Sequence, residues 1–273
     1  MIPIIGYGNT INLFTFFLKN ATNMKRILIP ILSTLFLLAS CKKDDAPQYD
    51  PNVKAELSVE FDNIAGASDL QLNTATYTNA TGESFNVTKL KYYVSNFILT
   101  NSNGTVYKVP QEECYFLIDE SDATTHNPKL NIPEGEYKTL SFTIGIDSLR
   151  NTMDISNRIG ALDPTTTAAD MYWSWNSGYI FFKMDGTSTA ITGMGNVFQY
   201  HVGGFGGYAT PTTNNLRTIT LDLTARGMPQ VKSGKESNVH LFADIMKALN
   251  GTTNMSFATT SMIHSATAGI PVA

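Results

Sequence analysis

The segment DMYWSWNSGYIFFKMDG, residues 170–186, holds both tryptophans of the chain, Trp173 and Trp175. Residues 179–186 are mostly aromatic and aliphatic, a composition typical of a buried β-strand. If the preceding piece is extended, Trp173 and Trp175 project to one side, because strand side chains alternate with a period of two. The segment therefore predicts a buried strand with two indoles at its start. They would close one end of a β core or lie beside a functional centre.

Strand-like runs like this one recur along most of the chain. Some alternate apolar and polar residues, and others are continuously apolar. Turn residues such as Gly, Pro, Asn and Asp separate them at regular distances. The runs occupy residues 55–61, 89–100, 105–110, 114–119, 136–147, 179–186, 196–203, 216–223 and 238–245.

Helical signals are sparse and confined to residues 148–162 and 245–249. Long connections are expected near 120–135, 148–175 and 203–215, and long connections are often functional. The pattern predicts an all-β fold, an antiparallel β-sandwich with long functional loops.

The N-terminal part has the features of a targeting segment. Basic residues at 25 and 26 precede an apolar run over residues 27–38, followed by LASC at 38–41. The run is short for a membrane span, and small residues before a cysteine are typical of a bacterial lipoprotein signal. The alternative is an ordinary signal peptide with a chance cysteine. We expect Met24 to be the true start and Cys41 to be lipidated.

This signal predicts three parts of the chain. Residues 1–40 form the leader and signal peptide, 41–53 the lipidated cysteine and a flexible tether, and 54–273 one β-sandwich domain. The membrane would be reached through the lipid anchor. We expect an outer-membrane lipoprotein that faces the periplasm or the cell surface. Lysine and aspartate residues directly after Cys41 resemble the surface-export signals of some outer-membrane lipoproteins and favour the cell surface.

Charge argues against nucleic acid as a partner. The whole chain carries −4, and removing residues 1–40 takes away three basic residues and no acid, which leaves −7. An acidic domain lacks the basic surface that nucleic-acid binding requires. The remaining cysteine, Cys114, lies in an apolar run and is expected to be a buried core residue.

No motif for catalysis stands out. The chain lacks a G-x-S-x-G elbow, an H-E-x-x-H pair, a Walker A loop and a dinucleotide fingerprint. No nucleophile and base, and no pair of acids, is evident. We therefore expect a binding protein and not an enzyme.

Three of the four histidines, His201, His240 and His264, lie in strand-like surroundings, whereas His126 lies in a loop. Imidazole suits copper or zinc, and a methionine thioether suits Cu(I). Each histidine could instead be a hydrogen-bonded structural residue.

Several segments together resemble a known family. YWSWNSGYIFFKMDG is followed by FQYHVGG at 198–204 and by MIHSATAG at 262–269. Residues 59–100 add a first strand and a later tyrosine-rich strand. This combination resembles the MbnP-like domain, the methanobactin-associated copper-binding family, over residues 54–273.

The resemblance implies a β-rich extracytoplasmic protein that binds copper through histidines and serves copper acquisition or handling. His201 and His264 match histidine-bearing segments of the family, and His240 is a third candidate ligand. The resemblance also implies a di-haem partner of the MbnH type, which oxidises a tryptophan near the metal. Trp173 and Trp175 are the two candidates.

The alternative function is a surface lipoprotein without metal, which binds a glycan, peptide or protein through aromatic residues. Exposure distinguishes the two functions. An open groove lined by Tyr172, Trp173, Trp175 and Tyr179 would favour ligand binding, whereas burial of the indoles next to histidines would favour the metal.

Overall fold

The computed structural model describes residues 15–18, 47–173, 178–208, 210–251, 253–267 and 269. The expected signal peptide after Met24, the lipidation site Cys41 and Trp175 lie outside these residues, whereas residues 15–18 of the expected leader are described. Strands in the described part are β1 (Thr15–Leu18), β2 (Lys54–Ala65), β3 (Ser68–Asp69), β4 (Tyr77–Thr78), β5 (Ser84–Asn101), β6 (Val106–Lys108), β7 (Tyr115–Asp119), β8 (Lys129–Pro133), β9 (Gly135–Ile144), β10 (Tyr172–Trp173), β11 (Gly178–Ser188), β12 (Val197–Gly203), β13 (Arg217–Asp222), β14 (Gln230–Val231), β15 (Asn238–Asp244) and β16 (Met262–Ile263).

Helical pieces are short. They are α1 (Ser148–Thr152), α2 (Met246–Leu249) and the 3₁₀ turns η1 (Gln111–Glu113), η2 (Ala123–Thr125), η3 (Ile155–Asn157), η4 (Gly160–Leu162), η5 (Met194–Asn196) and η6 (Thr224–Arg226). No helix among the described residues is long and apolar enough to cross a membrane.

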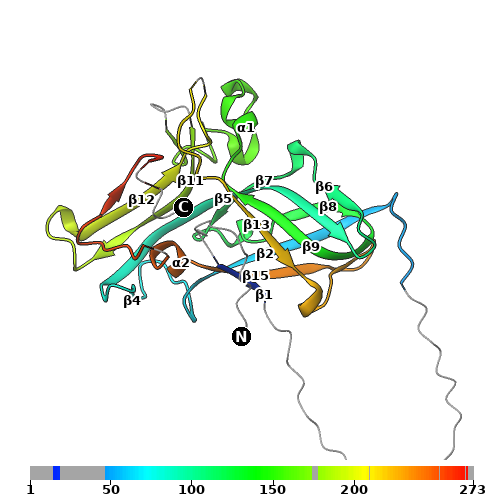
Figure 1. Ribbon diagram of the computed structural model, residues 1–273, viewed down its shortest axis with the longest axis horizontal. Helices are drawn as coiled ribbons and strands as arrows, with labels where there is room; N and C mark the ends of the chain where they lie inside the picture. Colours follow the sequence, from blue (N-terminus) through cyan, green and yellow to red (C-terminus); the bar gives the residue numbers. More distant parts are fainter. Residues whose placement is uncertain are drawn as a thin grey trace, which may run out of the picture.

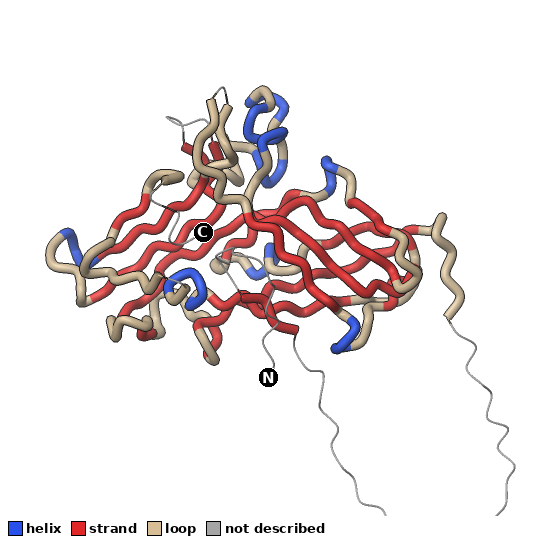
Figure 2. The backbone as a smooth tube through the Cα atoms, in the orientation of Figure 1, coloured by secondary structure: helices blue, strands red, loops and turns tan. Residues whose placement is uncertain are grey.

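Two sheets build the fold (Figures 1 and 2). The smaller sheet has the order β1-β15-β2-β3, with β8 also on β2, and the larger has the order β13-β9-β5-β11-β12-β16 with short strands added. They pack face to face, since Phe61 of β2 lies 5.5 Å from Phe142 of β9 and 6.2 Å from Tyr92 of β5, measured between ring centroids. The predicted all-β sandwich is confirmed.

Strand burial follows from the sequence pattern. In β2 every second residue from Leu57 to Ala65 is buried, as alternation on a half-buried strand requires. Two ladders differ from the antiparallel expectation, because β15 pairs with β2 and β12 with β16 in parallel. Residues 129–133, expected in a loop, form β8 on the edge of β2.

A second, smaller core covers the outer face of the large sheet. It unites Tyr93 of β5 and Phe181 of β11 with Ile146, Leu162 and Met171 of the long connection between β9 and β11. This connection contains α1, η3 and η4, in agreement with the predicted long loop. The histidines and lysines described below lie on the same outer face, next to this core.

Glu83 anchors the C-terminal region to the start of β5. Burial acts to raise the pKa of Glu83, but hydrogen bonds from Ser256, Asn79 and the backbone N–H groups of Phe257 and Ala258 outweigh it and lower the pKa to about 2. The lowered pKa means that the ionised carboxylate stabilises the fold.

We expect Glu83→Gln to lower the free energy of unfolding by about 2 kcal/mol at neutral pH, a value reduced for solvent screening. The wild-type protein should lose this contribution as the pH falls from 4.5 towards 2, because only the unfolded chain takes up the proton in that window. Urea unfolding across this pH range measures both effects. Glu56→Gln is the control, since its ion pair with Lys129 is exposed. Equal costs for the two variants would refute the anchoring role.

Candidate metal centre

His201 and His264 are brought together by the parallel ladder between β12 and β16. Gln199 pairs with Met262 and Tyr200 with Ile263, so His201 and His264 come next in register. Tyr200 and Ile263 are buried in the main core. Because side chains alternate along a strand, the two histidines lie on the opposite, outer face of the sheet.

The two imidazole rings stack on each other, with centroids 4.5 Å apart and planes inclined by 20°. His201 Nε2 lies 2.7 Å from Asp185 Oδ1. A carboxylate only accepts, so Nε2 donates and Nδ1 of the neutral ring keeps the lone pair. Loss of water contact lowers the pKa of His264, as do His201 and Lys183, against the opposing effect of Asp185. A neutral imidazole is the form that binds a metal.

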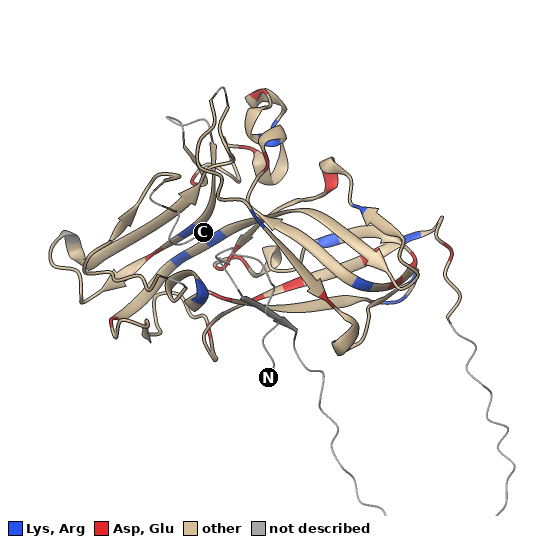
Figure 3. Ribbon diagram, viewed as in Figure 1, with Lys and Arg blue, Asp and Glu red and all other residues tan. Residues whose placement is uncertain are grey.

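Lysines surround one carboxylate beside the histidine pair. Lys183 is paired with His201 across β11 and β12, and Lys91 with Lys183 across β5 and β11. Asp170 Oδ2 lies 2.9 Å from Lys89 Nζ and 3.3 Å from Lys183 Nζ, and its Oδ1 lies 3.3 Å from Lys91 Nζ. Lys89 and Lys91 lie on β5 and Lys183 on β11, which are neighbours in the middle of the large sheet. Figure 3 shows basic residues, in blue, among the strands.

Asp170 is ionised at any ordinary pH. Burial acts to raise its pKa, but the three lysines outweigh burial and hold the pKa far below the usual value. Lys183 is 7% exposed and also donates to the backbone oxygen of Asp170, at 2.7 Å. The cluster therefore keeps three ammonium groups in place next to the histidines.

Trp173 lies on the same face of the sheet. It is 3% exposed, and a Cβ atom on Gly203 would come within 2.6 Å of its ring. Gly203 and His201 are two residues apart on β12, so both face the indole side. The absence of a side chain at 203 thus lets the indole pack against the strand that carries His201.

The aromatic residues do not line an open groove. Tyr179 is fully buried, Tyr172 is half-buried, and Trp173 is nearly buried. Trp173 borders a pocket of about 340 Å³ that also includes Phe205, Ser265 and Ala266. The same pocket includes the exposed Tyr208, whereas Tyr172 and Tyr179 are not part of its lining.

His240 does not join the pair. It lies on β15 of the smaller sheet, with Nε2 2.9 Å from Asp62 Oδ2 and Nδ1 3.4 Å from Glu60 Oε2. The expected convergence of three imidazoles is corrected to two, because β15 pairs with β2 and not with β12. Within the described ranges no group of three or more His, Cys, Asp or Glu side chains is arranged to hold a metal ion.

The chemistry of the donors fits copper. Two imidazoles provide nitrogen ligands that copper accepts, and the carboxylate on His201 is the kind of partner that orients a ligating ring. The ring planes are nearly parallel, however, so one ring must turn before both lone pairs can point at one ion. His264 is exposed, which leaves its ring room to turn.

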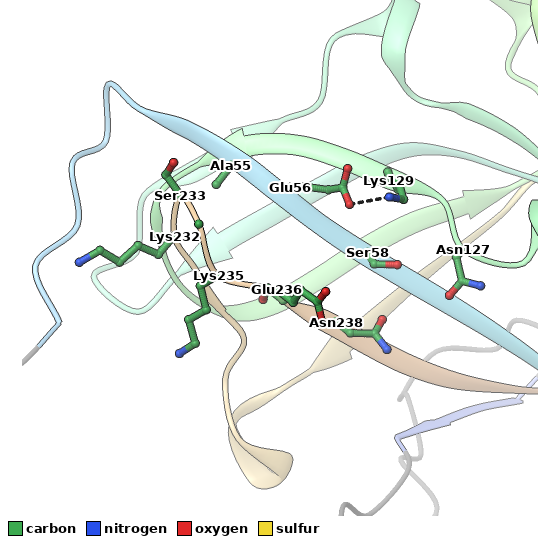
Figure 4. A pocket seen from close by; sticks show the side chains of 12 residues that line it. Ala55, Glu56, Ser58, Asn127, Lys129, Lys232, Ser233, Lys235, Glu236 and Asn238 are labelled. Carbon is green, nitrogen blue, oxygen red and sulfur yellow. Dashed lines mark ion pairs between the residues drawn. The ribbon is translucent and has the colours of Figure 1, made fainter.

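A larger hollow lies beside β2 of the smaller sheet (Figure 4). It encloses about 660 Å³ between β2 and the loop before β15. Its lining is polar, and its lysines already have partners: Lys129 pairs with Glu56 at 2.8 Å, Lys235 donates to Gln230, and Lys232 to the backbone of Gln48. It has none of the aromatic lining that the alternative function requires.

Sequence reasoning missed Asp185, Lys183 and Asp170. Charged residues within the apolar run YIFFKMDG were the available signal for Lys183 and Asp185, because a charge in a buried strand needs a partner.

Cys114 is fully buried, as expected, and burial raises the pKa of its thiol.

Comparisons with known proteins agree with this fold. A family model, MbnP, matches residues 54–265. The chain therefore belongs to the MbnP family. The solved structure of MbnP from Methylosinus trichosporium is similar, with a TM-score of 0.50, 14% sequence identity and coverage of 72% of this chain and 77% of that chain. At this identity the likeness shows the fold alone. No curated protein matches the sequence.

Proposed function

We propose that this protein is a copper-binding member of the MbnP family that binds one ion through His201 and His264 and serves copper acquisition or handling. The observation that carries the proposal is the stacked imidazole pair with Asp185 on His201. Membership of a methanobactin-associated family supports the choice of copper. Binding, not catalysis, is the role proposed.

His201→Ala and His264→Ala are each expected to abolish stoichiometric copper binding, because a single imidazole cannot hold the ion alone. The measurement is anaerobic Cu(I) titration of the purified protein, with metal analysis of the same samples. His240→Ala is the matched control and should bind like the wild type. Copper binding that survives both pair variants, or that His240→Ala removes, would contradict the assignment.

The di-haem partner is proposed on the same family basis. Trp173 lies against Gly203, on the strand that carries His201, which supports it as a candidate for the oxidation. Intact mass after co-expression with an MbnH-type protein would report conversion of tryptophan to kynurenine. Peptide mass spectrometry would then assign it to Trp173 or Trp175.

We also propose that Cys41 anchors the protein to the outer membrane. The LASC segment supports this proposal. Incorporation of labelled fatty acid, lost in Cys41→Ser, tests it. Protease treatment of intact cells distinguishes the periplasmic face from the cell surface.

A further inference from the structure

A pocket of about 350 Å³ opens on the outer side of the long connection between β9 and β11. This volume is at the lower end of those typical for small-molecule sites. Residues of η1, α1, η3 and η4 line it, and they include two arginines, Arg150 and Arg158. Nothing in the copper proposal uses this pocket.

Arg158 is a buried cation outside the ion pairs of the described residues. It is 7% exposed, and the carboxylate on which its charge acts is that of Asp154, whose pKa it helps to lower after the hydrogen bonds from Ser156. Its Nη2 donates to the backbone oxygens of Asn151 and Met153, both at 2.9 Å, and its Nε donates to Met153. The guanidinium also lies 5.2 Å from the ring of Tyr172 and 5.4 Å from that of Tyr179.

One nitrogen of Arg158, Nη1, is buried and has no hydrogen-bond partner. Arg150 repeats this feature, since its Nε is buried and unpartnered although Nη2 pairs with Glu112 at 3.0 Å. Leaving the donor of a buried charged group unsatisfied costs more than leaving a neutral one. Two such donors in the lining of one pocket point to an anion that accepts from them.

The pocket wall is held in place before any ligand arrives. The hydroxyl of Tyr93 donates to the backbone oxygen of Ala161 at 2.8 Å, and that of Tyr179 donates to Leu162 at 2.5 Å. Asn151 is 1% exposed and donates to the backbone of Ile146. A wall fixed in this way reduces the entropy lost on binding.

Carboxylates near the pocket are already occupied. Asp147 accepts hydrogen bonds from Tyr115 and Asn96, and Asp154 accepts from Ser156. Glu112, paired with Arg150, has a side chain that is 78% exposed. None of them satisfies Nη1 of Arg158 or Nε of Arg150.

Apolar side chains complete the lining. Met153 and Leu162 border the pocket, and Ile159 at its mouth is 78% exposed. Leu149 and Ile155 of the same connection are 59% and 53% exposed. An anion with an apolar body fits this combination of buried donors and exposed aliphatic groups better than a bare inorganic ion.

We propose that this pocket binds a small organic carboxylate, whose oxygens accept from Arg158 and Arg150 and whose apolar body lies against Met153, Leu162 and Ile159. The carboxylate supplies the acceptor that Nη1 of Arg158 lacks. The site lies apart from the histidine pair and does not require copper.

Calorimetric titration of the full-length protein in detergent tests the proposal, with benzoate and hexanoate as probes. Benzamide and hexanamide are the uncharged controls of the same shape. Inorganic phosphate is the control anion that has no apolar part. We expect the carboxylates to bind and the amides to bind at least about tenfold more weakly, since a hydrogen bond to a charged group contributes on that scale. Phosphate should also bind more weakly, because it has no apolar body to bury against Met153, Leu162 and Ile159.

Arg158→Gln and Arg150→Gln should each weaken carboxylate binding by about tenfold or more. Arg226→Gln, which removes an exposed arginine of η6, is the charge-matched control and should bind like the wild type. If Arg158→Gln fails to fold, Arg150→Gln and Ile159→Asp test the proposal instead, and both should weaken carboxylate binding. Ile159 is largely exposed, so its substitution should leave the fold intact. Absence of carboxylate binding, equal binding of amides, equal or tighter binding of phosphate, or unchanged binding in the folded arginine variants would overturn the proposal.

Discussion

Phe198→Ala is expected to lower the free energy of unfolding by about 3–5 kcal/mol, the range for removing a fully buried aromatic ring. Phe198 is fully buried, and its ring stacks on Phe257 with centroids 4.5 Å apart. It also contacts Phe85 at 6.2 Å and Tyr200 at 5.4 Å. The loss has two parts, the apolar surface of the ring and the cavity that its rigid neighbours leave open.

Packing around Phe198 makes relaxation difficult. A Cβ atom on Gly186 would lie 2.5 Å from its ring and 2.1 Å from the backbone oxygen of Asn86, so the neighbouring strands already approach closely. Urea unfolding measures the cost. Phe116→Ala, at a half-buried ring on β7, is the control and should cost clearly less. A cost for Phe198→Ala no larger than that of the control would contradict this account.

Asp170→Asn is expected to cost about 2–3 kcal/mol, less than the ~3–5 kcal/mol for breaking a fully buried charge pair, because Asp170 and Lys89 are each about a third or more exposed. The substitution leaves Lys89, Lys91 and Lys183 as neighbours without their shared carboxylate. Lys91 keeps Asp119, at 2.9 Å. Lys183 is 7% exposed and forms no other ion pair among the described residues, so it accounts for most of the cost.

The pH dependence gives a second readout for Asp170. Its pKa in the folded protein lies far below the usual 3.8, so the ionised form stabilises the fold above that pH. The wild type should lose this contribution as the pH falls below 3.8, and Asp170→Asn should lack that part of the acid dependence.

Removing Lys183 provides the matching test. Asp170→Asn combined with Lys183→Met should recover part of the lost stability, because the buried ammonium is gone. Copper affinity should also fall in Asp170→Asn, since the net positive charge next to His201 and His264 increases. The cluster would be excluded as a stabilising unit if the losses of the two single variants simply added in the double variant. A cost of Asp170→Asn below about 0.5 kcal/mol would exclude it as well.

Much of the fold could be predicted from local pattern. Each strand-like run that was predicted lies within or across an observed strand, because apolar alternation reports which side of a strand is buried. β8 ends in Pro133, a residue that argues against a strand, and β16 has only two residues, so neither gave a strand signal. Their assignment depends on the partner strand, which lies far away in the chain.

By itself, the sequence determined the all-β class, the long connection after β9 and the family to which the chain belongs, since these depend on local composition and on motifs that are contiguous. Only the tertiary structure decided which histidines meet. Parallel pairing of β16 with β12 places His264 beside His201, and parallel pairing of β15 with β2 takes His240 to the other sheet. Strand partners are chosen by packing of the whole core, and no local pattern around a histidine records that choice.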